Sequence, residues 1–158
     1  MKRISTRILF TAFTLAILNG VVSCNAKKHM ITEYTEENKA IPPEFGRDPN
    51  TTLVLVLQNR NSYDRFLKKA VIENYKGDYV LITKEQMKQP PYDDVAKYRY
   101  VFDYDYGAVN PRANHKRFHI YDRLDKRRWE SGAEFPAFGK AIEIYITNLE
   151  TKRKSTQQ

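Results

Sequence analysis

Residues 51–83 read TTLVLVLQNRNSYDRFLKKAVIENYKGDYVLIT, and this stretch decides the fold. The apolar run at 52–57 has the length and branching of a strand that is buried on both faces. Between 63 and 75 apolar residues recur along one helical stripe, which Asn61 or Ser62 can cap and Gly77 can end in a left-handed conformation. A second apolar run follows at 79–83. Strand, helix and strand at this spacing predict a right-handed βαβ unit with parallel strands.

The rest of the chain adds three predicted strands and a helix. Residues 98–106 alternate aromatic with mostly polar side chains, as in a strand, and 117–121 and 127–130 predict a hairpin. Residues 138–149 fit both a helix and a strand, and the helical match is longer. The sequence therefore predicts one two-layer α/β (α+β) domain in the order β-α-β-β-β-β-α. Its mixed sheet should have about five strands and carry two helices.

The first residues have the layout of a secretory signal. Lys2, Arg3 and Arg7 precede the apolar run at 8–18, and small or branched residues then lead to Cys24. The apolar run is shorter than the roughly 20 residues that cross a bilayer. An ordinary signal peptide or a mitochondrial presequence with an incidental cysteine is the alternative reading.

The segment Val21-Val22-Ser23-Cys24 resembles the lipobox of bacterial lipoproteins, and Cys24 is the one cysteine of the chain. The resemblance implies that a diacylglyceryl group is attached to the Cys24 thiol, that cleavage occurs before Cys24, and that the new amino group is acylated. Several acyl chains anchor a protein stably, since each buried CH₂ contributes about 0.8 kcal/mol. The resemblance is confined to the targeting segment and implies a membrane-anchored protein of the cell envelope.

The residues after Cys24 and the charge refine the expected location. The residue directly after Cys24 is Asn25 and not an aspartate, and by family resemblance this favours the periplasmic side of the outer membrane. Loss of Lys2, Arg3 and Arg7 with the signal lowers the net charge from +8 to +5. This charge suits an anionic glycolipid, peptidoglycan or an acidic envelope protein, and an exported protein rarely meets nucleic acid.

The chain divides into four predicted regions. Residues 1–23 form the cleaved signal, 24–50 a lipidated cysteine and flexible polar tether, 51–151 the globular domain and 152–158 a basic, frayed tail. As a flexible coil, the tether would reach roughly 25–30 Å.

Aromatic and basic residues supply the candidate binding surface. Tyr98, Tyr100, Phe102, Tyr104 and Tyr106 share one face of the predicted strand. We expect the middle three to be core and the outer two to reach an edge, with a stacking surface for sugars or a peptide as the alternative. The hairpin interleaves arginine with aromatic residues, as interfaces often do. The candidate surface comprises Tyr98, Tyr106, Tyr121, Arg123, Arg127, Arg128 and Trp129.

No motif for catalysis or cofactor binding is recognisable. Six glycines form neither a dinucleotide-binding nor a P-loop pattern, and no Gly-x-Ser-x-Gly occurs. His115 and His119 are four residues apart, but the surrounding pattern is not helical and no third ligand is evident, so we expect no metal site. The aspartates at 103, 105, 122 and 125 are expected to pair with Arg99, Arg117 or Arg123.

Two functional hypotheses follow. The first is a non-catalytic, lipid-anchored binding or assembly module that holds an envelope partner near the membrane. The second is a carbohydrate-acting hydrolase of the envelope that uses the carboxylates of Asp103, Asp105 or Asp122. We favour the first, because no catalytic motif accompanies these acids.

Overall fold

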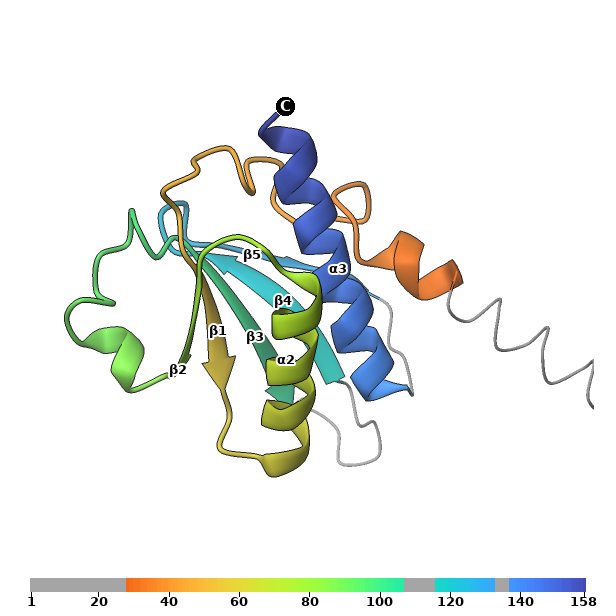
Figure 1. Ribbon diagram of the computed structural model, residues 1–158, viewed down its shortest axis with the longest axis horizontal. Helices are drawn as coiled ribbons and strands as arrows, with labels where there is room; N and C mark the ends of the chain where they lie inside the picture. Colours follow the sequence, from red (N-terminus) through yellow and green to blue (C-terminus); the bar gives the residue numbers. More distant parts are fainter. Residues whose placement is uncertain (1–27, 107–115, 133–136) are drawn as a thin grey trace, which may run out of the picture.

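A five-stranded mixed sheet with two helices across one face forms the body of the protein (Figure 1). The computed structural model describes residues 28–106, 116–132 and 137–158. Residues 28–33 are helical. The elements that follow are β1 (Leu53–Leu57), α2 (Asn61–Asn74), β2 (Tyr79–Thr83), the 3₁₀ turn η1 (Gln86–Lys88), β3 (Tyr100–Tyr106), β4 (Lys116–Asp122), β5 (Arg127–Glu130) and α3 (Phe138–Thr156).

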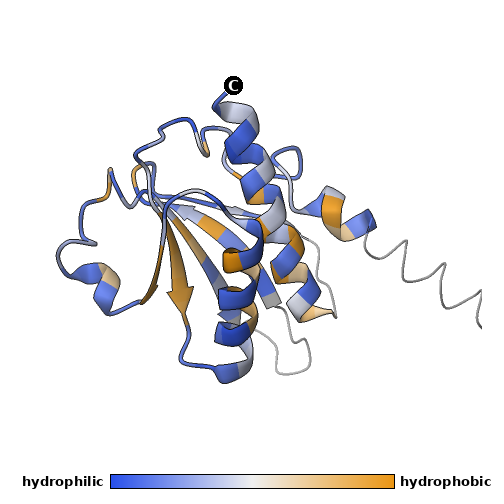
Figure 2. Cartoon of the chain, in the orientation of Figure 1, coloured by the Kyte–Doolittle hydropathy of each residue, from blue (hydrophilic) through white to orange (hydrophobic). Residues whose placement is uncertain are grey.

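The strand order β2-β1-β3-β4-β5 confirms the predicted fold class and element order. β1 pairs in parallel with β2 on one side and with β3 on the other, while β4 and β5 continue the sheet in antiparallel fashion. The central position of β1 explains its uniformly apolar sequence, which Figure 2 shows along the whole strand. The ambiguous stretch at 138–149 lies within α3, so the helical prediction is confirmed.

The core lies between the sheet and the two helices. Alternate residues of β3 point into it, so Tyr100, Phe102 and Tyr104 are buried against the helices, as predicted. Phe102 stacks on Phe118 of β4 with ring centroids 5.8 Å apart, and Tyr145 of α3 meets Phe102 edge-on at 5.2 Å. Such aromatic pairs contribute about 0.5–1.5 kcal/mol beyond their buried area.

The ends of α2 differ from the prediction. Arg60 takes the N-cap position, without a side-chain cap. Asp64 in the first turn instead accepts hydrogen bonds from the backbone N–H groups of Gln58 and Arg60, at 2.9 and 3.1 Å. α2 ends at Asn74, and Gly77 has no positive φ. A Cβ at Gly77 would lie 2.7 Å from the Cδ of Arg153, so close packing rather than a left-handed turn accounts for this glycine.

The prediction of a flexible tether over 24–50 is wrong for the described part of that range. Its apolar side chains are buried in the core beside α3. The backbone carbonyl of Ala40 accepts a hydrogen bond from the Tyr145 hydroxyl, and Asn148 donates to the carbonyls of Ile31 and Tyr34 at 2.8 Å each. The buried set comprises Met30, Tyr34, Ala40, Ile41 and Phe45. The globular unit therefore begins at or before residue 28.

The predicted frayed tail at 152–158 also belongs mostly to the fold. α3 continues through Thr156, and the guanidinium of Arg153 donates to both carboxylate oxygens of the buried Glu150, at 2.9 and 2.8 Å. Lys152 forms an ion pair of 2.6 Å with Glu36 of the amino-terminal segment. These contacts fix the last turns of α3 against residues 28–50.

Candidate functional site

The strands β1, β2 and β3 are parallel, so their carboxyl ends lie at the same edge of the sheet. Polar side chains gather there, on the sheet face that the helices leave open. The chain leaves β1 to form β2 on one side and returns to form β3 on the other, so the boundary between β1 and β3 is a topological switch point. Ligands of open α/β sheets bind at such points. Gln58 follows β1, Lys84 follows β2, and Asp103 and Asp105 lie on β3. The sequence analysis missed Gln58 and Lys84, although their places directly after two predicted parallel strands were a usable signal.

Asp103 is the centre of this group. It is 6% exposed, and its Oδ1 accepts hydrogen bonds from the side-chain amide of Gln58 at 2.5 Å and from the backbone N–H of Tyr104 at 2.7 Å. Its Oδ2 lies 2.9 Å from the ammonium of Lys84. Asp103 thus connects the ends of β1, β2 and β3.

Asp105 lies two residues further along the same face and is half-exposed. Its carboxylate pairs with Arg128 of β5, which also pairs with Glu130. Partial burial acts to raise the pKa of Asp105, but the hydrogen bond from Arg128 and the positive charges around it together outweigh burial and keep this pKa below its usual value. Asp105 is therefore ionised at neutral pH.

His119 of β4 stands directly opposite Asp103 in the antiparallel register. It is also 6% exposed, and its Nδ1 is buried without a hydrogen-bond partner among the described residues. Burial and the charge of Arg128 lower the pKa of His119, and the neighbouring carboxylates oppose this shift without reversing it. The imidazole is therefore neutral at pH 7, with a lone pair on one ring nitrogen.

Asp103, Asp105 and His119 form what we call the switch-point cluster. One potential ligand atom of each residue lies within 4.8 Å of the other two. The metal-ligating pair that the sequence analysis considered was His115 and His119. His115 lies outside the described residues, and the partners that the structure gives to His119 come from another strand.

The predicted pairing of aspartates with arginines is correct only in part. Arg99 binds Asp122 with two nitrogens and reaches Asp125 at 2.9 Å, as expected. Asp103 and Asp105 pair instead with Lys84 and Arg128. Asp122 is opposite Tyr100 in the register, three residues from His119 along β4 and on the alternate face. It therefore does not join the acids that the hydrolase hypothesis grouped with it.

The candidate binding surface is divided by the structure. Tyr98 precedes β3 and is buried on the open face of the sheet with Val54, Val56 and Ile82, so it is not part of the Tyr100 stripe. The side chain of Tyr106 lies outside the described residues. Arg123 donates to the backbone carbonyls of residues 92 and 98 and fixes the loop before β3.

The remaining members lie at the β4–β5 edge. Tyr121 is 37% exposed and is opposite Arg128 on the open face. Arg127 lies 4.0 Å above the ring of Trp129, which packs partly against the helical core on the alternate face. Tyr121 of β4 and Arg127 of the edge strand β5 are thus exposed, and Arg128 is also held by ion pairs with Asp105 and Glu130.

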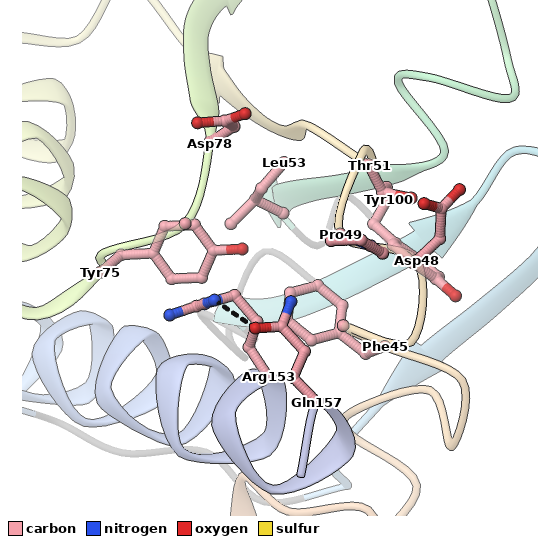
Figure 3. Close-up of a pocket in the computed structure, with 12 residues that line it drawn as sticks. Phe45, Asp48, Pro49, Thr51, Leu53, Tyr75, Asp78, Tyr100, Arg153 and Gln157 are labelled. Carbon is pink, nitrogen blue, oxygen red and sulfur yellow. Dashed lines mark hydrogen bonds between the residues drawn. The ribbon is translucent and has the colours of Figure 1, made fainter.

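Figure 3 shows a pocket between the end of α3 and the amino-terminal segment. Its volume of about 30 Å³ admits a water molecule but no organic ligand. The side chain of Arg153 lies across it and donates to Gln157 at 2.8 Å. Gly46 has a φ of +83°, and a Cβ there would lie 2.6 Å from the Cα of Arg153. This pocket is a packing junction of residues 28–50 with α3.

Comparison with known proteins identified no relative of this chain: no family model, curated protein or solved structure matches it. Among the described residues, no helix is both long enough and apolar enough to cross a bilayer.

Proposed function

We propose that the protein is a lipid-anchored, non-catalytic binding or assembly module of the bacterial cell envelope. The observation that carries this proposal is the position of Cys24, the single cysteine, directly after a basic and then apolar signal-like segment. An unpaired cysteine in an exported chain calls for a specific explanation. Attachment of lipid supplies one, and it gives the protein a stable membrane location without a spanning helix.

The packing of residues 28–50 changes the expected distance from the membrane. Only three residues lie between Cys24 and Lys28, where the described fold begins, so four residue-to-residue steps connect them. A chain reaches at most about 3.6 Å per residue, so the fold begins within roughly 14 Å of the anchor. We therefore expect a domain held against the lipid headgroups, and a partner at the membrane surface rather than deep in the periplasm.

Replacement of Cys24 by alanine should release the protein from the membrane fraction. The thiol that receives the first lipid is then absent, and a lipobox without its cysteine is not a substrate for acylation. We expect wild type to incorporate labelled palmitate and to remain in sedimented membranes, and Cys24→Ala to do neither. Fractionation together with palmitate labelling measures both outcomes.

Ser23→Ala is the matched control, because it keeps a small residue before the cysteine and should leave both readouts at the wild-type level. Membrane retention of Cys24→Ala, or wild type without incorporated palmitate, would contradict the lipid anchor.

The partner surface can be located by photo-crosslinking in cells. Tyr121 of β4 and Arg127 of the edge strand β5 are both exposed in the β4–β5 hairpin, on opposite faces of the sheet. A photoreactive amino acid at either position should give a discrete adduct with an envelope component. Ile72, exposed on α2, is the control position and should give none. Adducts of equal yield at all three positions, or adducts at position 72 alone, would show that the edge of β5 is not the partner surface.

A further inference from the structure

We propose that Asp103, Asp105 and His119 bind a divalent first-row transition-metal ion such as Zn²⁺ on the open face of the sheet. The proposal is independent of the lipid anchor, because it rests on one juxtaposition. One carboxylate oxygen of each aspartate and one ring nitrogen of His119 all lie within 4.8 Å of one another. With metal–ligand bonds of about 2.0–2.2 Å in tetrahedral geometry, ligand atoms lie about 3.3–3.6 Å apart, so the three side chains would draw together by up to about 1.5 Å when an ion binds.

The state of His119 is the second observation, and it is separate from the acidic residues. Buried polar atoms in proteins nearly always have hydrogen-bond partners. His119 is 94% buried, yet its Nδ1 has no partner within the described part of the chain. Imidazole nitrogen is a common ligand of Zn²⁺ in proteins, at Zn–N distances of about 2.0–2.1 Å. A metal ion bound at Nδ1 would give this buried atom the partner that it lacks among the described residues.

Asp103 is already oriented as a ligand. The amide of Gln58 and the backbone N–H of Tyr104 both donate to its Oδ1. The Oδ2 is left for a cation, and Lys84 now occupies that position. Hydrogen bonds of this kind to ligating carboxylates position them and typically change metal affinity 10–100-fold. Gln58 would therefore be a positioning residue of the site.

Lys84 is the cation that a metal would replace. Its side chain is 50% exposed and reaches Asp103 from the end of β2. The ammonium can move into solvent, provided that the incoming ion neutralises the buried Asp103 carboxylate in its place. Arg128 is held by Glu130 as well as by Asp105 and can remain beside Asp105 when the other oxygen of that carboxylate binds metal. Exchange of one cation for another keeps the carboxylates neutralised.

The ligand types select the class of metal. Imidazole with carboxylate suits zinc, manganese, iron, cobalt and nickel, whereas calcium and magnesium favour sets composed of oxygen. The half-exposed Asp105 gives an ion access from solvent and leaves positions for water. We therefore expect Zn²⁺ to bind and a tenfold excess of Ca²⁺ or Mg²⁺ not to displace it.

Calorimetric titration of the full chain with Zn²⁺ tests the proposal. Each measurement is repeated in a Cys24→Ser background, because a thiolate also binds Zn²⁺. We expect one Zn²⁺ per chain at this site. His119→Gln and Asp103→Asn should each weaken binding by about 100-fold or more, since each removes a direct ligand. Lys84→Ala should strengthen binding about fivefold by removing the competing ammonium. His29→Gln, a change of the exposed histidine at the amino-terminal helix, is the matched control and should leave the affinity unchanged.

The change in Zn²⁺ affinity caused by Lys84→Ala distinguishes binding at Asp103 from nonspecific binding elsewhere on the surface. Lys84 is at the surface, so Lys84→Ala should fold normally even where His119→Gln does not, and circular dichroism of each variant establishes this. Absence of Zn²⁺ binding by wild type would overturn the proposal. So would affinity that is unchanged in folded His119→Gln and Asp103→Asn, or affinity that falls in Lys84→Ala.

Discussion

A chain that begins at Thr51 should not fold, whereas one that begins at Lys28 should unfold in a single cooperative transition. The shorter chain lacks Met30, Tyr34, Ile41 and Phe45, all buried against α3 and the sheet. Burial of a side chain of this size contributes about 1.5–3 kcal/mol. Loss of four approaches the whole 5–15 kcal/mol by which a domain is stable.

The loss also removes the hydrogen-bond partners of two polar side chains of α3. The Tyr145 hydroxyl donates to Ala40, and Asn148 donates to the carbonyls of Ile31 and Tyr34, so α3 would lose these contacts together with its apolar cover. Circular dichroism with urea titration measures the outcome. A cooperative transition in the Thr51 chain at a urea concentration close to that of the Lys28 chain would contradict this account. A point variant, Phe45→Ala, tests the same contact in the longer chain and should cost about 3–5 kcal/mol.

The difference between residues 28–50 and the βαβ unit shows what sequence patterns can reveal. β1, α2 and β2 were predictable because apolar residues in regular secondary structure recur with a fixed period or form a continuous run. The period is 2 in a strand with one buried face and 3.6 in a helix, and a continuous run marks a strand that is buried on both faces. The buried side chains within 34–50 are spaced along a succession of turns. Ala40 and Ile41 are buried as neighbours and Phe45 after a turn, which matches no period. Pro42, Pro43 and Gly46, which suggested a tether, instead shape a packed loop.

The switch-point cluster was predictable only in its separate parts. Asp103 and Asp105 were identified as residues of one strand face, and His119 as a residue of the following strand. Their proximity depends on the register of β3 with β4, which places His119 opposite Asp103. A shift of one residue would move His119 to the other face. The sequence at 107–115, between the two strands, contains no Asn-Gly or Asp-Gly pair that would fix that register.

The placement of Tyr98 shows a related limit. Simple alternation assigns it to the same face as Tyr100, but β3 begins only at Tyr100. The backbone turns before that point, where the Tyr98 N–H donates to the carbonyl of Asp94 at 3.0 Å. Tyr98 therefore packs on the open face with Tyr92, with ring centroids 5.2 Å apart. Alternation of the sequence predicts which face a side chain occupies within a strand, but it does not apply to residues that precede the strand, such as Tyr98.

Replacement of Asp122 by alanine should destabilise the fold far more than the same change at Asp125, although both carboxylates bind Arg99. The Asp122 side chain is 2% exposed and that of Asp125 is 60% exposed. Asp122 takes hydrogen bonds from two guanidinium nitrogens of Arg99 and from the backbone N–H groups of Leu124 and Asp125. Its removal leaves an arginine charge and two turn amides without this acceptor.

Loss of one partner of a buried ion pair typically costs about 3–5 kcal/mol, because the remaining charge is left desolvated. Arg99 is one-fifth exposed, so we expect a loss near the lower end of that range for Asp122→Ala. Asp125→Ala removes a surface contact and should cost less than about 1 kcal/mol. Asp122→Asn, which keeps the shape and one acceptor, should fall between the two. Urea unfolding of the three variants measures these differences.

Equal losses in Asp122→Ala and Asp125→Ala would show that burial does not decide the strength of the pair. The expected order also bears on function, since a carboxylate that binds Arg99 and the β4–β5 turn through four hydrogen bonds has no lone pair directed at a substrate. Of the three aspartates considered for carbohydrate hydrolysis, Asp122 is thus assigned to stability. Asp103 and Asp105 remain the acids of the open face, where the metal titration tests them.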